Sequence, residues 1–184
     1  PTILGTNRDE PSLFMVRAPE YVENWLGFLP RLKDEAAYKR AVYYGAQAWK
    51  YRGVDSFANY MSAAGNDNVY AYRFDWDEEP SQLGFDLSVA LGAAHGLEIA
   101  FVFNDFDGGM GIGYIYPGDE AQHSLANSMT SYWSEFAYNG DPGQGRDGKE
   151  PHWLSWGEQG KRSIILDTPA DQGIFMDDEE VVLG

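Results

Sequence analysis

Two residues of this 184-residue chain have neighbours that suit proton-transfer chemistry. His95 lies in the stretch LGAAHGLEIAFVF over 91–103, between small residues that let the backbone turn sharply and leave an imidazole open to a partner. A histidine held in this way is suited to moving protons, because the ordinary pKa of its side chain lies near neutrality. The apolar residues that follow are expected to anchor this turn to a hydrophobic core. A buried core histidine is the alternative interpretation.

The second residue is Glu10, in the loop after an apolar strand predicted over 2–6. Pro11 lacks a backbone donor and disfavours helical backbone at Glu10, so the glutamate is expected at a turn within the loop 7–14. Polar residues at the end of a buried strand are where α/β proteins often place their chemistry. Residue type alone favours a solvated loop carboxylate.

The elements that would position these residues begin with a helical stretch from about 20 to 64. Tyr21, Trp25 and Phe28 recur at helical spacing, and the range 35–51 predicts a long helix. A further helix is expected to begin at a cap, for which the candidates are Asp55 and Ser56.

The second half mixes strands and a helix. Alternating apolar residues predict a strand over 69–76, and β-formers predict another over 162–167. A helix is expected over 119–139, where an Asn-Gly-Asp-Pro run stops it. The acidic stretch 177–180 is expected to be solvated, as are His123 and His152.

Composition excludes several classes of protein. Hydrophobic residues make up 43% and aromatic residues 15%, which indicates a globular chain with a core. The net charge of -16 disfavours nucleic-acid and membrane-surface partners. Without cysteine there are no disulfides, thiolate metal sites or cysteine nucleophiles, while the compartment stays open between cytoplasmic and secreted.

The glycine-rich segment 104–113 is expected to be a flexible loop and not a ligand site. Phe103 stands where a calcium loop has its first ligand, and no glutamate closes the loop. The glycines also lack the G-x-G-x-x-G spacing of dinucleotide sites. We therefore expect no metal and no cofactor.

The chain begins with Pro1, without an initiator methionine or a signal peptide, and its first residues read as a strand already under way. We therefore expect a fragment or a processed chain. No internal repeat or long linker divides the sequence, so 1–184 is expected to form part of one domain.

Several segments follow one another in an order that carries a resemblance: GTNRDE at 5–10, YAYRFDW at 70–76, GAAHGLEIAFVF at 92–103 and WSEFAYNGDP at 133–142, with Trp153 and Trp156 beyond. In this order they resemble the C-terminal part of type B carboxylesterases, the family of cholinesterases and bacterial para-nitrobenzyl esterases. The resemblance implies an α/β fold: the C-terminal part of an α/β-hydrolase, a central mixed sheet flanked by helices, incomplete without an N-terminal segment.

The resemblance also implies roles for particular residues. Glu10 matches the acid of a Ser-Glu-His triad and His95 its base, in the chain order that α/β-hydrolases use. By position in the same motifs, Leu13 and Phe14 would line a substrate pocket and Leu97 its rim. Glu98, a second carboxylate near the histidine, is expected to be a structural hydrogen-bonding group.

The sequence departs from the family in several ways. No G-x-S-x-G nucleophile elbow occurs, and the glycine loop that supplies oxyanion-hole amides is missing too. Pro11 stands where the family usually has glycine, and the lack of cysteine fits the microbial branch better. The expected partners are thus a serine-bearing N-terminal segment or chain and a small apolar ester.

Two other functions remain open. A non-catalytic, cholinesterase-like interaction module would keep the fold and lose triad members, although the presence of both Glu10 and His95 disfavours it. The third possibility is an acidic soluble α+β domain of unknown role.

Overall fold

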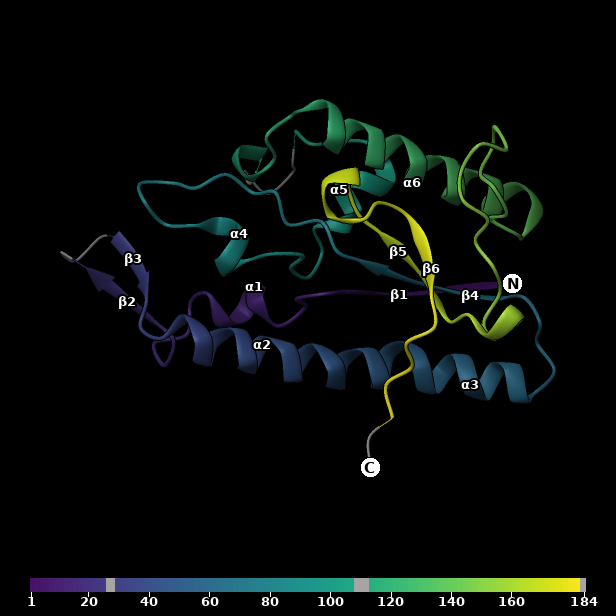
Figure 1. Cartoon of the computed structure of the whole chain (residues 1–184), viewed down its shortest axis with the longest axis horizontal. Coiled ribbons are helices and arrows are strands. Elements are labelled where there is room, and N and C mark those ends of the chain that lie inside the picture. The colour runs from purple at the N-terminus through teal and green to yellow at the C-terminus, as the bar shows by residue number, and fades with distance from the viewer. Residues whose placement is uncertain (26–28, 108–112, 183–184) are drawn as a thin grey trace.

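The computed structural model describes residues 1–25, 29–107 and 113–182. A four-stranded mixed sheet lies at its centre, in the order β1-β4-β5-β6 (Figure 1). The strands are β1 (Thr2–Asn7), β4 (Val69–Phe74), β5 (Ser163–Leu166) and β6 (Phe175–Asp177). The first three run parallel and β6 is antiparallel to β5. The three strands predicted from the sequence are confirmed, and β6 was not predicted.

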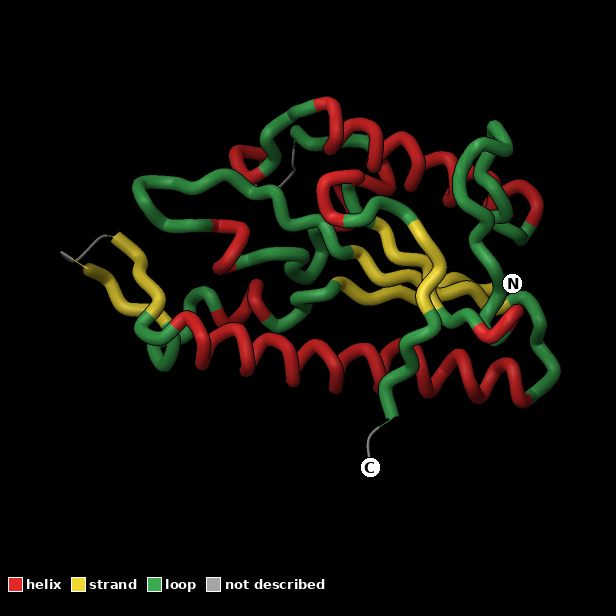
Figure 2. Tube along the Cα trace, viewed as in Figure 1, coloured by secondary structure: helices red, strands yellow, loops and turns green. Residues whose placement is uncertain are grey.

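Helices cover both faces of the sheet (Figures 1 and 2). One face carries α2 (Glu35–Lys50), which begins where the Asp34 carboxylate accepts a hydrogen bond from the amide of Ala37 at 2.9 Å. The other carries α5 (Glu98–Phe103) and α6 (Glu120–Asn139). The helix α6 ends at Gly140 with a φ of 75°, a left-handed conformation that glycine adopts without strain. Both long helices match the prediction.

The expected helix over Tyr21, Trp25 and Phe28 is wrong. Residues on either side of the undescribed 26–28 instead form an antiparallel hairpin of β2 (Val22–Trp25) and β3 (Leu29–Leu32). Pro30 lies inside β3, where its missing amide rules out a helix interior but is tolerated in a two-stranded ribbon. Phe28 lies outside the described residues.

The expected capped start at Asp55 or Ser56 is also wrong. The chain passes from α2 through a π-helical turn, Tyr51–Asp55, directly into α3 (Ser56–Ala63). Asp55 does not cap a helix; its carboxylate pairs with Lys50 Nζ at 2.8 Å, and both side chains are almost fully buried. The π turn brings these two residues together, five positions apart.

The acidic stretch 177–180 is not solvated throughout. Asp178 is exposed, as expected, but the Glu180 carboxylate accepts hydrogen bonds from Arg162 and Asn59. The same segment meets the buried ion pair, because the amide of Val181 donates to Asp55. The C-terminal segment is therefore fastened across α2 and α3.

Replacing Lys50 by methionine should lower the free energy of unfolding by about 3–5 kcal/mol, because it leaves the Asp55 charge buried without its partner. Urea unfolding followed by circular dichroism measures this. The matched control is Lys39→Met, which removes an exposed ion pair with Glu35 on the same helix and should cost about 0.5 kcal/mol or less. Equal losses for the two variants would contradict the prediction.

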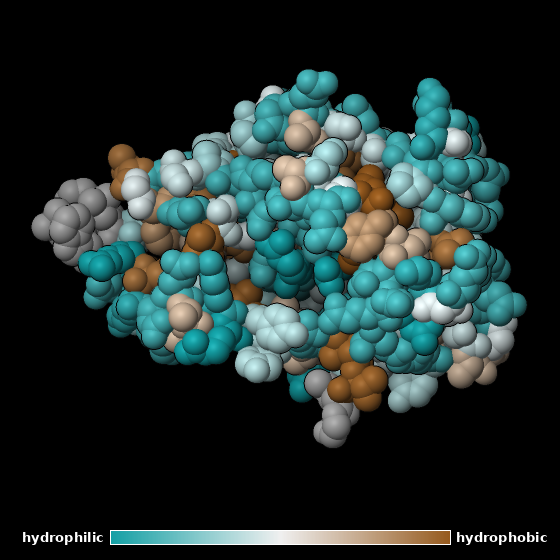
Figure 3. Space-filling model, viewed as in Figure 1, coloured by the Kyte–Doolittle hydropathy of each residue, from teal (hydrophilic) through white to brown (hydrophobic). Residues whose placement is uncertain are grey.

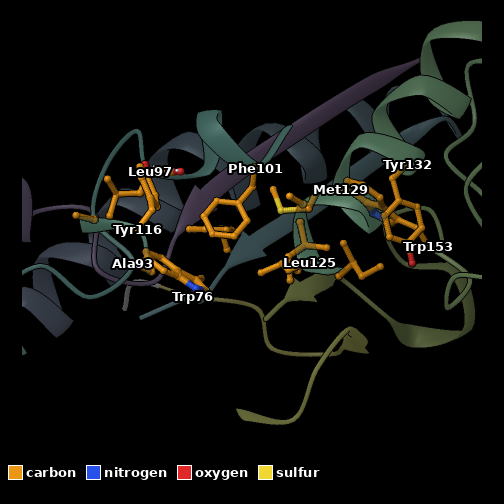
Figure 4. Close-up of a cluster of buried hydrophobic side chains, with 14 of the residues drawn as sticks. Trp76, Ala93, Leu97, Phe101, Tyr116, Leu125, Met129, Tyr132 and Trp153 are labelled. Carbon is orange, nitrogen blue, oxygen red and sulfur yellow. Dashed lines mark hydrogen bonds between the residues drawn. The ribbon is translucent and has the colours of Figure 1, made fainter. Parts of the chain in front are cut away.

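The main core lies between the sheet and α5–α6, where aromatic rings pack in edge-to-face pairs (Figure 4). Phe101 meets Phe74 with ring centroids 5.0 Å apart, and Trp153 meets Tyr132 at 5.4 Å. The remaining helices are short: α1 (Ser12–Met15), α4 (Leu87–Ala90) and the 3-10 turns Gly113–Ile115, Glu158–Gly160 and Pro169–Asp171.

A buried carboxyl makes stability depend on pH. Glu79 is 4% exposed, neither of its oxygens has a hydrogen-bond partner among the described residues, and burial raises its pKa to about 9. The folded state therefore holds a proton that the unfolded state releases near pH 4.5, so this group makes stability fall as the pH rises from about 4.5 to about 9.

Glu79→Gln should therefore stabilise the protein at pH 8 by up to about 5 kcal/mol, since each of the roughly 3.5 pH units between the unfolded pKa and pH 8 corresponds to about 1.4 kcal/mol. Thermal unfolding at pH 5 and pH 8 measures the change, which should be much smaller at pH 5. A gain in stability of the same size at pH 5 and at pH 8 would contradict the prediction.

The surface in Figure 3 is predominantly hydrophilic, with smaller hydrophobic areas between. None of the helices in the described part of the chain has the length and apolar character needed to cross a membrane.

Candidate active site

The loop after β1 buries Glu10 and holds its carboxylate in place. The side chain is only 6% exposed. Its Oε1 accepts a hydrogen bond from the amide of Asn7 at 2.8 Å and one from Thr6 Oγ1 at 3.3 Å. These donors leave Oε2 turned toward a different part of the chain.

The turn that bears His95 comes between α4 and α5. Gly92 and Gly96 both have positive φ, 51° and 83°, so the backbone bends on each side of the histidine as the small residues predict. A β-carbon at Gly92 would lie 2.5 Å from Asp9 Oδ2, so the close approach of the two loops also requires glycine there.

The two loops place His95 Nδ1 2.6 Å from Glu10 Oε2. An ionised carboxylate only accepts hydrogen bonds, so Nδ1 carries the proton in this contact and Nε2 is the basic nitrogen. The imidazole is 45% exposed, which leaves it open to a reacting group. The pair thus has the arrangement of a carboxylate that orients a general base.

Polar residues beside Glu10 join the two loops, and sequence reasoning missed them. Asn7 Nδ2 donates to the carbonyl of Ala94 and to Glu98 Oε2, each at 2.6 Å.

Further hydrogen bonds join the same two loops. The amide of Asp9 donates to the carbonyl of Ala93, and the amide of Ala93 donates to Asp9 Oδ2. Ser12 Oγ donates to the carbonyl of Leu91. Their position at a strand end was the available signal.

Pro11, the departure from the family pattern, packs on α2. A β-carbon at Gly45 would lie 2.8 Å from Pro11 Cγ, so the proline ring fits because residue 45 is glycine. This contact fixes the acid-bearing loop against the helix.

Two exposed aromatic rings flank the imidazole. Phe14 lies 5.8 Å and Trp49 5.3 Å from the His95 ring, measured between centroids. Trp49 comes from α2 and was not among the predicted site residues.

The other predicted pocket residues lie deeper. Leu13 is partly buried and packs against the main core. Leu97 is 2% exposed and contacts that core beside Tyr116, so its side chain faces inward (Figure 4). Of the three, Phe14 is the residue exposed next to His95.

Glu98 is the second carboxylate near His95. Burial raises its pKa, while the hydrogen bond from Asn7 acts in the opposite direction. The hydrogen bond from Asn7 to Glu98 is consistent with the structural, hydrogen-bonding role expected for this carboxylate from the sequence.

His123 and His152 are exposed, as predicted. In the described ranges, no group of three or more histidine and carboxylate side chains is arranged to hold a metal ion. The segment 108–112, part of the glycine-rich loop, lies outside those ranges.

Comparisons with known proteins all match this chain to esterases. The family model described as the carboxylesterase family matches residues 26–180, a range that contains His95 and begins after Glu10. Para-nitrobenzyl esterase of Bacillus subtilis (strain 168) is 27% identical over 181 residues, covering 91% of this chain and 34% of the relative. Human cocaine esterase is 38% identical over 86 residues, 46% of this chain and 14% of the relative.

Solved structures show the same fold. A PNB esterase structure superimposes with a TM-score of 0.61 at 21% identity, covering 96% of this chain and 36% of that protein. An esterase from anaerobic Clostridium hathewayi, described as able to hydrolyse aliphatic aromatic polyesters, has a TM-score of 0.56 at 17% identity. The fold is thus part of an α/β-hydrolase, and the chain spans about a third of these structures. With the family match covering residues 26–180, the chain belongs to the carboxylesterase family.

Proposed function

We propose that this chain supplies the acid and the general base of a serine carboxylesterase, whose nucleophile lies on a segment outside the 184 residues. The observation that carries the proposal is the contact of 2.6 Å between His95 Nδ1 and the buried carboxylate of Glu10. Family membership supports the reaction class. A non-catalytic interaction module would not need a buried carboxylate directed at a half-exposed imidazole.

In this mechanism His95 Nε2 accepts the proton of the serine hydroxyl as the serine oxygen attacks the ester carbonyl. Glu10 stabilises the imidazolium that forms. The imidazolium then donates its proton to the leaving alcohol, and an acyl-enzyme remains. In the second half, His95 takes a proton from the water that attacks the acyl group, and then returns it to the serine oxygen as the bond to the acyl group breaks, which releases the carboxylic acid and regenerates the serine hydroxyl.

The serine and the donors that stabilise the oxyanion come from the missing segment, which is therefore the proposed partner. The substrate is a small ester with an apolar group, because the apolar ring of Phe14 is exposed beside His95, while Leu13 packs against the main core. Leu97 contributes through the packing beneath the turn, not through a surface that meets the substrate.

The test is to co-express the chain with the serine-bearing segment of its own esterase and assay hydrolysis of 4-nitrophenyl butyrate. We expect turnover by the assembled pair, and none above background from the chain alone. The same pair built with His95→Ala is the matched control. Assembly of the two parts without any hydrolysis would overturn the proposal.

A further inference from the structure

A shallow groove of about 290 Å³ runs along α2 and the π turn beside the catalytic pair. It is lined by Gly45, Ala48, Trp49, Arg52 and Gly53. Three of these five have side chains no larger than a methyl group, so the groove is open between one aromatic residue and one cation. A β-carbon at Gly53 would meet only Trp49 Cδ1, at 3.9 Å.

The aromatic end of the groove touches the catalytic imidazole. Trp49 is 39% exposed, and its ring centroid lies 5.3 Å from that of His95 and 6.5 Å from that of Phe14. A planar group on the exposed part of Trp49 would therefore lie close to the base. Stacking against aromatic rings favours an aromatic group over an aliphatic one.

The other end of the groove is positively charged. Arg52 is exposed, and among the described residues no carboxylate pairs with its guanidinium. It is a local positive charge in a chain with a net charge of -16. A guanidinium recognises a carboxylate through paired hydrogen bonds.

We propose that this groove binds the aromatic ring of a substrate whose far side carries a carboxylate, so that the preferred esters are half-esters of aromatic dicarboxylic acids. The inference rests on the proposed function. Trp49, near the end of α2, and Arg52, in the π turn, both line the groove, which suits a ring with its ester and carboxylate at opposite ends. Trp49 and Arg52 thus become specificity-determining residues.

The test uses monomethyl terephthalate and its uncharged counterpart, methyl benzoate, titrated into the 184-residue chain. Binding is followed through the His95 ring signals in proton–carbon NMR spectra, which a bound aromatic ring shifts. We expect saturable binding of both probes, about fivefold tighter for the charged one.

Arg52→Gln should abolish this preference. The control Arg40→Gln removes an exposed arginine of α2 that does not line the groove, and it should keep the preference. Gly53→Leu should weaken binding of both probes by filling the groove. Equal affinities for the two probes in the unmodified chain, or equal losses in both arginine variants, would overturn the inference.

The same two esters, assayed as substrates of the assembled enzyme, separate this inference from the proposed function. A binding preference without hydrolysis of any ester rejects the proposed function and leaves the groove's ligand class in place. Hydrolysis without a preference for the half-ester rejects the specificity. A preference that the free chain shows and the assembled enzyme lacks assigns the groove to contacts with the serine-bearing segment, which also rejects it.

Discussion

Replacing His95 by alanine should lower the kcat of the assembled esterase by about 10⁶-fold. In the proposed mechanism the imidazole accepts the serine proton and returns it to the leaving alcohol, and its side chain is 45% exposed, which leaves it open to a nucleophile. Without it, the serine hydroxyl attacks as a neutral, weak nucleophile. Steady-state hydrolysis of 4-nitrophenyl butyrate measures the change, with KM expected to vary little.

His123→Ala and His152→Ala are matched controls, because both histidines are exposed and lie on other segments. Each should retain at least half of the activity. The measurement would count against the assignment if His95→Ala kept more than about 1% of kcat, or if either control lost as much. Circular dichroism of the three variants separates a lost base from a lost fold.

The sequence predicted those elements whose own residues determine them. The helices α2 and α6 have regular apolar spacing, and each begins at an aspartate whose carboxylate accepts a hydrogen bond from a backbone amide of the first turn. The parallel strands are rich in residues that favour β-structure. The prediction for the region before Pro30 was wrong because its aromatic spacing fits about two turns of a helix, while the proline fits only an edge strand. Local patterns could not decide between them.

The candidate site was predictable in its two central residues and not in their supports. The strand end and the small neighbours of the histidine marked Glu10 and His95 as candidates, and the resemblance to type B carboxylesterases selected them. Nothing in the sequence around Trp49 indicates a functional residue, because an aromatic residue on a helix usually belongs to the core. Its position beside His95 depends on how α2 packs against the two loops. The π turn after α2 is likewise fixed by packing, through the buried pair of Lys50 and Asp55.

Glu10→Gln should lower kcat by about 10⁴-fold, the loss seen when the acid of a serine triad becomes an amide. The amide has nearly the same shape, so Asn7 and Thr6 still find an acceptor at Oε1. Its nitrogen, however, donates to the imidazole and reverses the tautomer, leaving Nε2 protonated and unable to accept the serine proton. The negative charge that stabilises the imidazolium is lost as well.

Glu98→Gln is the control that makes this prediction specific. Glu98 is a second, partly buried carboxylate near the histidine, but it accepts a hydrogen bond from Asn7 Nδ2, and a glutamine oxygen can accept the same hydrogen bond. We expect less than a tenfold loss of kcat. If Glu98→Gln lost as much as Glu10→Gln, charge near the imidazole in general would matter, and the contact at Nδ1 would not be what orients the base. A large difference between the two variants therefore tests the tautomer, which the geometry at 2.6 Å implies.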